Sequence, residues 1–218
     1  MPTKPLAQIV DCYKGNLGKL ERALVRVGFT VRVAGLDFGG ADIVILPGMG
    51  SLGSLSEAEY AAVGSFLVNN TSIPVLGICA GMQLMYAGSK ENNGYVNSVS
   101  PVNRVLDYLE YTNTGQKSNI GWRGIKKLTG GSCEHWEAKS FWDKEFINYL
   151  DDTTVFFSHS FCDYEILSAE CVMTSETEQG SIVAAIIVEN NLGVQFHPEL
   201  SGFIGLEFFD LIRTKLCA

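Results

Sequence analysis

The sequence predicts an α/β protein with a doubly wound, mostly parallel sheet and an added antiparallel section, folded as a single domain over residues 1–218. In the first half, short apolar runs alternate with segments of helical periodicity, whereas the second half is dominated by short stretches rich in β-formers. The chain is 46% hydrophobic, enough to bury a core without a disulfide or metal. No linker, repeat or low-complexity tract divides it.

A β-α-β unit opens the chain. Ala7–Val10 is an apolar run that predicts a strand, and apolar residues then recur at helical spacing from Leu17 to Val27. Gly28 predicts the end of this helix, and Thr30–Val33 predicts the next strand. The loops are short, which favours parallel pairing through a helical crossover.

Two more strands and a capped helix complete the first half. Ile43–Leu46 predicts a third strand and Val75–Ile78 a fourth. Between them, Ser56 and Glu59 have the spacing of a capping box, which predicts a helix running to about Asn69.

The second half predicts six further short strands and a closing helix. The helix is the apolar-faced segment Phe203–Leu216. The strands are expected at Val102–Leu106, Ile125–Leu128, Val155–Ser158, Glu170–Thr174, Ser181–Val188 and Gly193–Phe196.

Charge and composition restrict the expected partners and cellular location of the protein. The net charge of −8 disfavours nucleic acid as a partner, because phosphates attract a basic surface. No apolar run reaches the ~18 residues of a membrane span, and residues 1–8 lack the apolar region of a signal peptide. We therefore expect a cytoplasmic protein. The six cysteines form no CxxC pair, so most are expected to be reduced core residues.

The first chemical signal is the motif Gly77–Gly81, which has Cys79 at its centre. A buried strand passes through Cys79 directly into a helix expected over Met82–Tyr86, the pattern of a nucleophile elbow with cysteine in place of serine. A helix N-terminus stabilises a thiolate, and the Ala80 N–H is expected to face a forming oxyanion. Taken alone, the motif fits a buried cysteine in a glycine-rich turn equally well.

His197 is the expected base for this nucleophile. It follows an apolar strand, and Pro198 favours an extended backbone that turns Glu199 to the same side as His197. A carboxylate on one ring nitrogen leaves the other free to take the thiol proton. A His-x-Glu pattern alone would normally be a surface strand end. Its coincidence with the elbow, also at the carboxyl end of a strand, predicts that Cys79, His197 and Glu199 form a triad.

The other histidines offer weaker alternatives. His159 also follows an apolar strand, but no carboxylate lies two residues later and Asp163 is four residues away. His135, in the polar segment Cys133–Trp136, could form a metal set with His159 and Cys162, but the spacings match no compact zinc pattern.

A glycine-rich turn, Pro47–Gly50, follows the third strand. Its glycines would let backbone N–H groups approach a ligand closely, which suits a second oxyanion donor. Taken by itself, the segment fits an ordinary turn better than an oxyanion donor.

Taken together, these motifs resemble the class I (triad) glutamine amidotransferases. Gly77–Gln83 and Gln195–Glu199 carry this resemblance. Within that group the chain is similar to the glutaminase subunit of imidazole glycerol phosphate synthase, through Asp11 with Gly15–Leu17, Leu46–Gly50, Asn119–Trp122, Ser158–Phe161 and Gly193–Glu199.

The resemblance implies hydrolysis of L-glutamine to glutamate and ammonia through a thioester on Cys79. It also implies a heterodimer in which ammonia is channelled to a (β/α)8-barrel cyclase, without metal or organic cofactor. By family match, Gly48, Gln83, Ser160 and Phe161 would hold glutamine. The oxyanion hole would comprise Ala80, Met49 and Gly50, and the partner would dock over Asn16, Trp122 and Leu200.

Three positions depart from the family pattern. Ala80 replaces a leucine, which should leave the oxyanion hole intact because only the N–H is used. Arg123 replaces an asparagine and Leu200 a lysine where the family meets its cyclase, so a paralogue feeding another synthase, for example in surface-sugar synthesis, is the main alternative.

Two other classes of function also fit parts of the sequence. A stand-alone γ-glutamyl hydrolase would use the same triad, but Asn119–Trp122 has no evident task there. A catalytically dead binding module would not need all three triad residues.

Overall fold

The computed structural model describes residues 4–11, 17–48, 55–90, 99–109, 118–129, 141–178 and 180–218. Within these ranges the central sheet has nine strands. In spatial order they are β2 (Thr30–Ala34), β1 (Leu6–Val10), β3 (Ile43–Leu46), β4 (Val75–Ile78), β12 (Asn191–Val194), β11 (Gly180–Val188), β10 (Cys171–Thr177), β7 (Asn119–Lys127) and β8 (Thr153–His159).

The first five strands pair in parallel, and each strand from β11 to β8 pairs antiparallel with its neighbour. This confirms the predicted fold class. That residues 1–218 form one domain stays a prediction.

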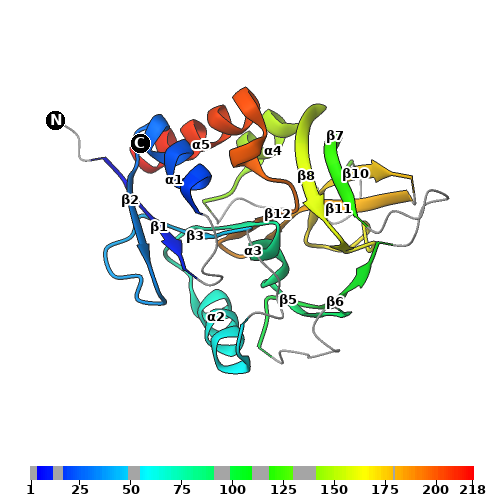
Figure 1. The fold of residues 1–218 in the computed structure, drawn as a ribbon, viewed down its shortest axis with the longest axis horizontal. Helices are drawn as coiled ribbons and strands as arrows, with labels where there is room; N and C mark the ends of the chain where they lie inside the picture. Colours follow the sequence, from blue (N-terminus) through cyan, green and yellow to red (C-terminus); the bar gives the residue numbers. More distant parts are fainter. Residues whose placement is uncertain are drawn as a thin grey trace.

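Helices cover both faces of the parallel half (Figure 1). One face carries α1 (Gly18–Val27), α4 (Lys144–Leu150) and α5 (Gly202–Leu216), and the other carries α2 (Glu57–Asn69) and α3 (Ala80–Gln83). The sequence of β3 shows why both faces are needed. Ile43 and Ile45 enter one apolar cluster, Val44 and Leu46 enter the other, and all four are buried.

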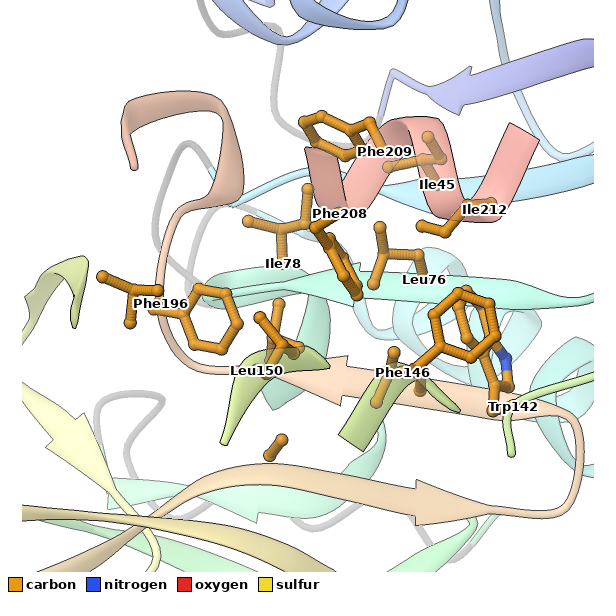
Figure 2. Packing of buried hydrophobic residues seen from close by; sticks show 14 of the residues in the cluster. Ile45, Leu76, Ile78, Trp142, Phe146, Leu150, Phe196, Phe208, Phe209 and Ile212 are labelled. Carbon is orange, nitrogen blue, oxygen red and sulfur yellow. The ribbon is translucent and has the colours of Figure 1, made fainter. Parts of the chain in front are cut away.

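Aromatic side chains fill the cluster beneath α5. Phe208 of α5 lies over Leu76 and Ile78 of β4, while Phe146 of α4 and Trp142 close one end (Figure 2). Truncating one of these buried aromatic residues to alanine would cost about 3–5 kcal/mol, so the cluster stabilises the packing of α5 on the sheet.

The predicted capping box is present. The Ser56 hydroxyl accepts from the Glu59 N–H at 3.3 Å, and the Glu59 carboxylate accepts from the Ser56 N–H at 2.9 Å. The helix it opens ends at Asn69, as the sequence predicts.

The helix predicted over Met82–Tyr86 is wrong in extent. The helix after the elbow is α3, which ends at Gln83, and Tyr86 instead begins β5 (Tyr86–Ser89). Tertiary pairing outweighs local periodicity here. β5 pairs with β6 (Val102–Tyr108), which pairs with β9 (Phe161–Cys162), and these strands form a second, three-stranded sheet.

Other boundaries also move. β7 begins at Asn119, six residues before the predicted start, because its alternating exposed and buried residues lack a continuous apolar run. β12 ends at Val194, so the three residues up to His197 lie beyond the regular strand. Among the residues that the structure describes, no helix is long and apolar enough to cross a membrane.

Candidate active site

The strand-to-helix turn at Cys79 is strained. Its φ of 47° and ψ of −105° lie outside the favoured regions for an L-residue, at a cost of about 1–3 kcal/mol. Flanking glycines permit the close approach. A Cβ on Gly77 would lie 2.6 Å from the Gly81 carbonyl oxygen, and one on Gly81 would collide with the Leu46 carbonyl. The turn thus has the tight geometry that the sequence predicts for an elbow.

Beyond the end of β12, the backbone of His197 is fixed by its neighbours. Its N–H donates to the Phe156 carbonyl of β8 at 2.8 Å, and its carbonyl accepts from the Ser201 hydroxyl at 2.7 Å. The same hydroxyl accepts from the Phe156 N–H at 3.0 Å. Ser201 therefore links the loop to β8 by hydrogen bonds just before α5 begins. The loop also packs closely on α5, because a Cβ on Gly205 would collide with the Pro198 carbonyl.

The imidazole of His197 lies between a thiol and a carboxylate. Its Nδ1 is 2.7 Å from Oε1 of Glu199, and the ring also hydrogen-bonds Cys79. Burial alone would lower the pKa of His197, but hydrogen bonds and charge interactions with Cys79 and Glu199 outweigh burial and raise this pKa to about 10. The surroundings therefore favour the imidazolium form of His197.

His159 is buried too, but its ring is used differently. Its Nδ1 is 3.0 Å from the Phe161 carbonyl, and its Nε2 is 3.0 Å from the side-chain nitrogen of Asn119. The pKa of His159 is lowered to about 4, chiefly by burial. The hydrogen bond with the Phe161 carbonyl acts in the opposite direction, and the charge of His197 adds to the lowering. A neutral ring that donates from Nδ1 and accepts at Nε2 satisfies both contacts, so neither nitrogen is left to take a thiol proton.

Two polar groups besides the imidazole approach the Cys79 sulfur. The Ser158 carbonyl is 3.6 Å from Sγ, and the side-chain Nε2 of Gln195 is 3.5 Å from it. Sequence reasoning did not single out Gln195, although it lies inside the motif that carries His197.

Gly48 lies directly against Cys79 and His197. A Cβ there would be 2.9 Å from Cβ of Cys79 and 2.9 Å from Cε1 of His197, so a side chain does not fit. Gly48 thus brings backbone to the site, as the predicted glycine turn requires. Met49, Gly50 and Asn16, which the sequence assigns to the oxyanion hole and the partner face, lie outside the described residues.

The residues predicted to hold glutamine gather next to the elbow. The buried Gln83 of α3 donates from Nε2 to the Phe161 carbonyl at 3.4 Å. Phe161 belongs to β9, and the neighbouring Ser160 carbonyl accepts from the Leu109 N–H at 2.9 Å. The small second sheet therefore places β9 beside α3.

Exposed apolar side chains lie near the start of α5. Trp122 of β7 is 51% exposed and packs edge-on against Phe156, and a Cβ on Gly202 would be 3.8 Å from its ring. Phe203 of α5 is 71% exposed, and Leu200 is partly exposed beside it. Apolar side chains from β7, the loop after His197 and α5 thus share one face.

A groove of about 1240 Å³ runs between α1 and α5, and a smaller cavity of about 190 Å³ lies next to it. Lys19, Glu199 and Leu200 line both. The smaller cavity also reaches Gly48, so it lies between the groove and the surroundings of Cys79 and His197.

The metal alternative gains no support within the described ranges, where no group of three or more His, Cys, Asp or Glu side chains is arranged to hold a metal ion. Cys133 and His135 lie outside those ranges.

Sequence comparisons agree with the family resemblance. The model of the family "Glutamine amidotransferase class-I" matches residues 8–203. The imidazole glycerol phosphate synthase subunit HisH of Sulfolobus acidocaldarius is 29% identical over 211 residues, covering 93% of this chain and 94% of the relative. The HisH subunit of Staphylococcus aureus is 30% identical over 203 residues, covering 91% and 92%.

Solved structures share the fold at lower identity. The structure of PurLQS from Thermotoga maritima matches with a TM-score of 0.64 and 18% identity, covering 98% of both chains. The glutaminase domain of CTPS from Trypanosoma brucei, solved with bound acivicin, matches with a TM-score of 0.62 and 15% identity, covering 98% of this chain and 94% of that one.

Proposed function

This chain belongs to the class-I glutamine amidotransferase family, and we propose that it is the glutaminase subunit of an imidazole glycerol phosphate synthase. The proposal draws on the two HisH relatives at 29% and 30% identity, each matched over more than nine-tenths of this chain. The observation that carries the chemistry is the placement of His197 between Cys79 and Glu199.

In the proposed reaction, the Cys79 thiol gives its proton to Nε2 of His197, because Nδ1 is held by Glu199. The sulfur attacks the side-chain carboxamide carbon of glutamine and forms a C–S bond. The resulting oxyanion is stabilised by the backbone N–H groups of Ala80 and the Met49–Gly50 segment. His197 then protonates the nitrogen as the C–N bond breaks. Ammonia departs, and a γ-glutamyl thioester remains on Cys79.

Water completes the cycle. His197 takes a proton from water, whose oxygen attacks the thioester carbon, and the C–S bond breaks to release glutamate and regenerate the thiol. We assign the holding of glutamine to Gln83, Gly48, Ser160 and Phe161. Support comes from the contact of Gln83 with Phe161 and from the fit of Gly48 against the reacting groups.

Cys79→Ser tests the nucleophile. We expect glutamate release to be abolished and a glutamine-analogue electrophile to label only the wild-type protein, at Cys79. The matched control is Cys162→Ser, because burial raises the pKa of the Cys162 thiol to about 12 and leaves it unreactive at neutral pH. Labelling at Cys162 would contradict the assignment.

The partner is proposed to be a (β/α)8-barrel cyclase docked over the face with Trp122 and Leu200, so that ammonia passes to it unprotonated. The cavity between Gly48 and the α1–α5 groove supports an opening on this side. Glutamate release is the test, measured with and without an imidazole-pathway cyclase and its nucleotide substrate. Strong activation would support this role, whereas full activity of the chain alone would favour a stand-alone γ-glutamyl hydrolase.

Leu200 and Arg123 favour a second candidate, a paralogous amidotransferase serving another synthase. By family match both positions meet the partner, and Leu200 offers an apolar contact where a lysine would offer a salt bridge. If Cys79 labels but the imidazole-pathway cyclase has no effect, this candidate gains support, and Leu200→Lys with Arg123→Asn becomes the variant to test. Binding through Leu200 should also depend little on ionic strength.

A further inference from the structure

We propose that Gln195 is a further catalytic residue, whose side-chain N–H donates a hydrogen bond to the Cys79 sulfur and stabilises it as a thiolate. The inference rests on the proposed role of Cys79 as nucleophile. It adds a fourth side chain to the chemistry, one that contacts the reacting atom itself.

Strand register brings Gln195 to the sulfur. β12 lies parallel beside β4, with Gly193 opposite Gly77 and Val194 opposite Ile78. The Cys79 N–H continues this ladder by donating to the Val194 carbonyl at 2.7 Å. The residue after Val194 is therefore next to the residue after Ile78, and Nε2 of Gln195 lies 3.5 Å from Sγ.

The surroundings of Gln195 fit a chemical role better than a packing role. Its side chain is completely buried, and its Oε1 has no hydrogen-bond partner among the residues that the structure describes. A buried oxygen without a partner destabilises the fold, whereas an apolar side chain of similar size would not. What the amide gains in return is its contact with Cys79.

The two neutral polar groups at the sulfur suit different protonation states. The Ser158 carbonyl can accept from a thiol S–H, but it can only repel a thiolate. The Gln195 N–H is a donor and favours the thiolate. The ionisable side chains in this region are His197 on the sulfur, Glu199 behind it and His159 close to His197.

The effect of such a donor changes along the reaction. A thioester sulfur carries no charge and is a weak acceptor, so the hydrogen bond is strongest before attack and again when the thiolate leaves during thioester hydrolysis. Gln195 is therefore expected to set the pH range in which Cys79 is reactive, while contributing little to the reactivity of the thiolate once formed.

Alkylation of Cys79 by iodoacetamide tests this directly. Loss of the unmodified Cys79 peptide, followed by mass spectrometry, gives a rate at each pH from about 5 to about 10. For Gln195→Met we expect the midpoint of this profile to rise by about one pH unit, with reaction about tenfold slower on the acidic side and a similar plateau. Gln195→Asn, whose shorter amide is drawn back from the sulfur, should show a smaller shift and serves if the methionine variant does not fold.

Asn191→Ser is the matched control. Asn191, on β12, is also a completely buried amide whose oxygen has no hydrogen-bond partner among the described residues, but its Nδ2 donates to the Leu67 and Val188 carbonyls rather than to Cys79. We expect this variant to lose thermal stability and keep the wild-type midpoint. An unchanged midpoint in Gln195→Met, or an equal shift in Asn191→Ser, would overturn the inference.

Glutamate release by the wild-type protein, measured separately, distinguishes the two proposals. A shifted alkylation profile in a protein that does not hydrolyse glutamine would defeat the proposed function and leave the role of Gln195 standing. Glutamine hydrolysis together with an unchanged profile would defeat the role of Gln195 alone.

Discussion

One buried histidine lies just beyond β12 and another lies at the end of β8, and the two differ in their hydrogen-bond partners and in their pKa. His197 is 3% exposed and faces a carboxylate and a thiol, whereas His159 is 6% exposed and faces a carbonyl and an amide. The pKa of the first is raised to about 10, and that of the second is lowered to about 4.

The comparison shows that burial alone does not decide what a histidine can do. Desolvation disfavours the charged form of both rings, but only for His197 do the interactions with neighbours, Cys79 and Glu199, outweigh it. The hydrogen-bond partners of each ring therefore decide whether it can take up a proton, as His197 can, or stays neutral in a structural role, as His159 does.

Replacing His197 should have the largest effect. We expect His197→Asn to reduce glutamine turnover by about 10²- to 10⁴-fold, because the proton carrier is lost. Steady-state glutamate release with matched protein concentrations measures this. A comparable loss in His159→Asn would contradict the assignment of His197 rather than His159 as the base.

Removing the carboxylate should have a smaller effect. Glu199→Gln keeps an acceptor oxygen near Nδ1 but loses one charge-assisted hydrogen bond, so we expect turnover to fall about 10- to 100-fold. The same variant should lower the pKa of His197, visible as a shift of its ring signals in NMR titration. An unchanged titration of His197 in Glu199→Gln would show that Glu199 does not raise the pKa of His197.

The two rings should also give opposite pH dependences of stability. The folded pKa of His197 lies above its ordinary 6.5, so its stabilising contribution is fully present below about 6.5 and is lost as pH rises to about 10. The folded pKa of His159 lies below 6.5, so its contribution is lost as pH falls from about 6.5 to about 4.

Denaturant unfolding at a series of pH values tests these slopes. His197→Asn should flatten the alkaline limb of the free energy of unfolding, and His159→Asn should flatten the acid limb. If the two variants flatten the same limb, the assignment of opposite charge states is wrong.

The smallest effect on activity is expected at His159. His159→Asn should cost about 1–3 kcal/mol of stability, because a shorter side chain cannot reach both Asn119 and the Phe161 carbonyl. Turnover should fall far less than in His197→Asn. Thermal unfolding and glutamate release on the same preparation separate the two consequences.

The parallel half of the fold was the more predictable from sequence. Ile43–Leu46 and Val75–Ile78 match β3 and β4 at both ends, because strands buried on both faces are wholly apolar and end at prolines, glycines or the elbow. Each antiparallel strand of the central sheet overlaps a predicted strand, but most extend beyond the prediction, as β7 does, and β9 of the second sheet was not predicted. α4 (Lys144–Leu150), a single short segment of mixed polarity, was missed.

The site was predictable where it lies within a motif and not where it depends on contacts across the fold. The elbow and the His-Pro-Glu segment are local patterns, and their convergence follows from the parallel sheet. Gln195 meets Cys79 across 116 positions, Ser201 meets Phe156 across 45, and Asn119 meets His159 across 40. No local spacing encodes such pairs, so their roles emerged only in three dimensions.

The linkage through Ser201 has a mechanical consequence. One hydroxyl joins the backbone of His197 to β8, and α5 begins at the next residue, pressed against Pro198 through the bare backbone of Gly205. The start of this helix therefore packs closely against the loop that carries His197. Gly202, Phe203 and Leu206 of the helix also line the groove between α1 and α5. We expect that a partner displacing the start of α5 would displace the imidazole as well, through this loop rather than through the aromatic core.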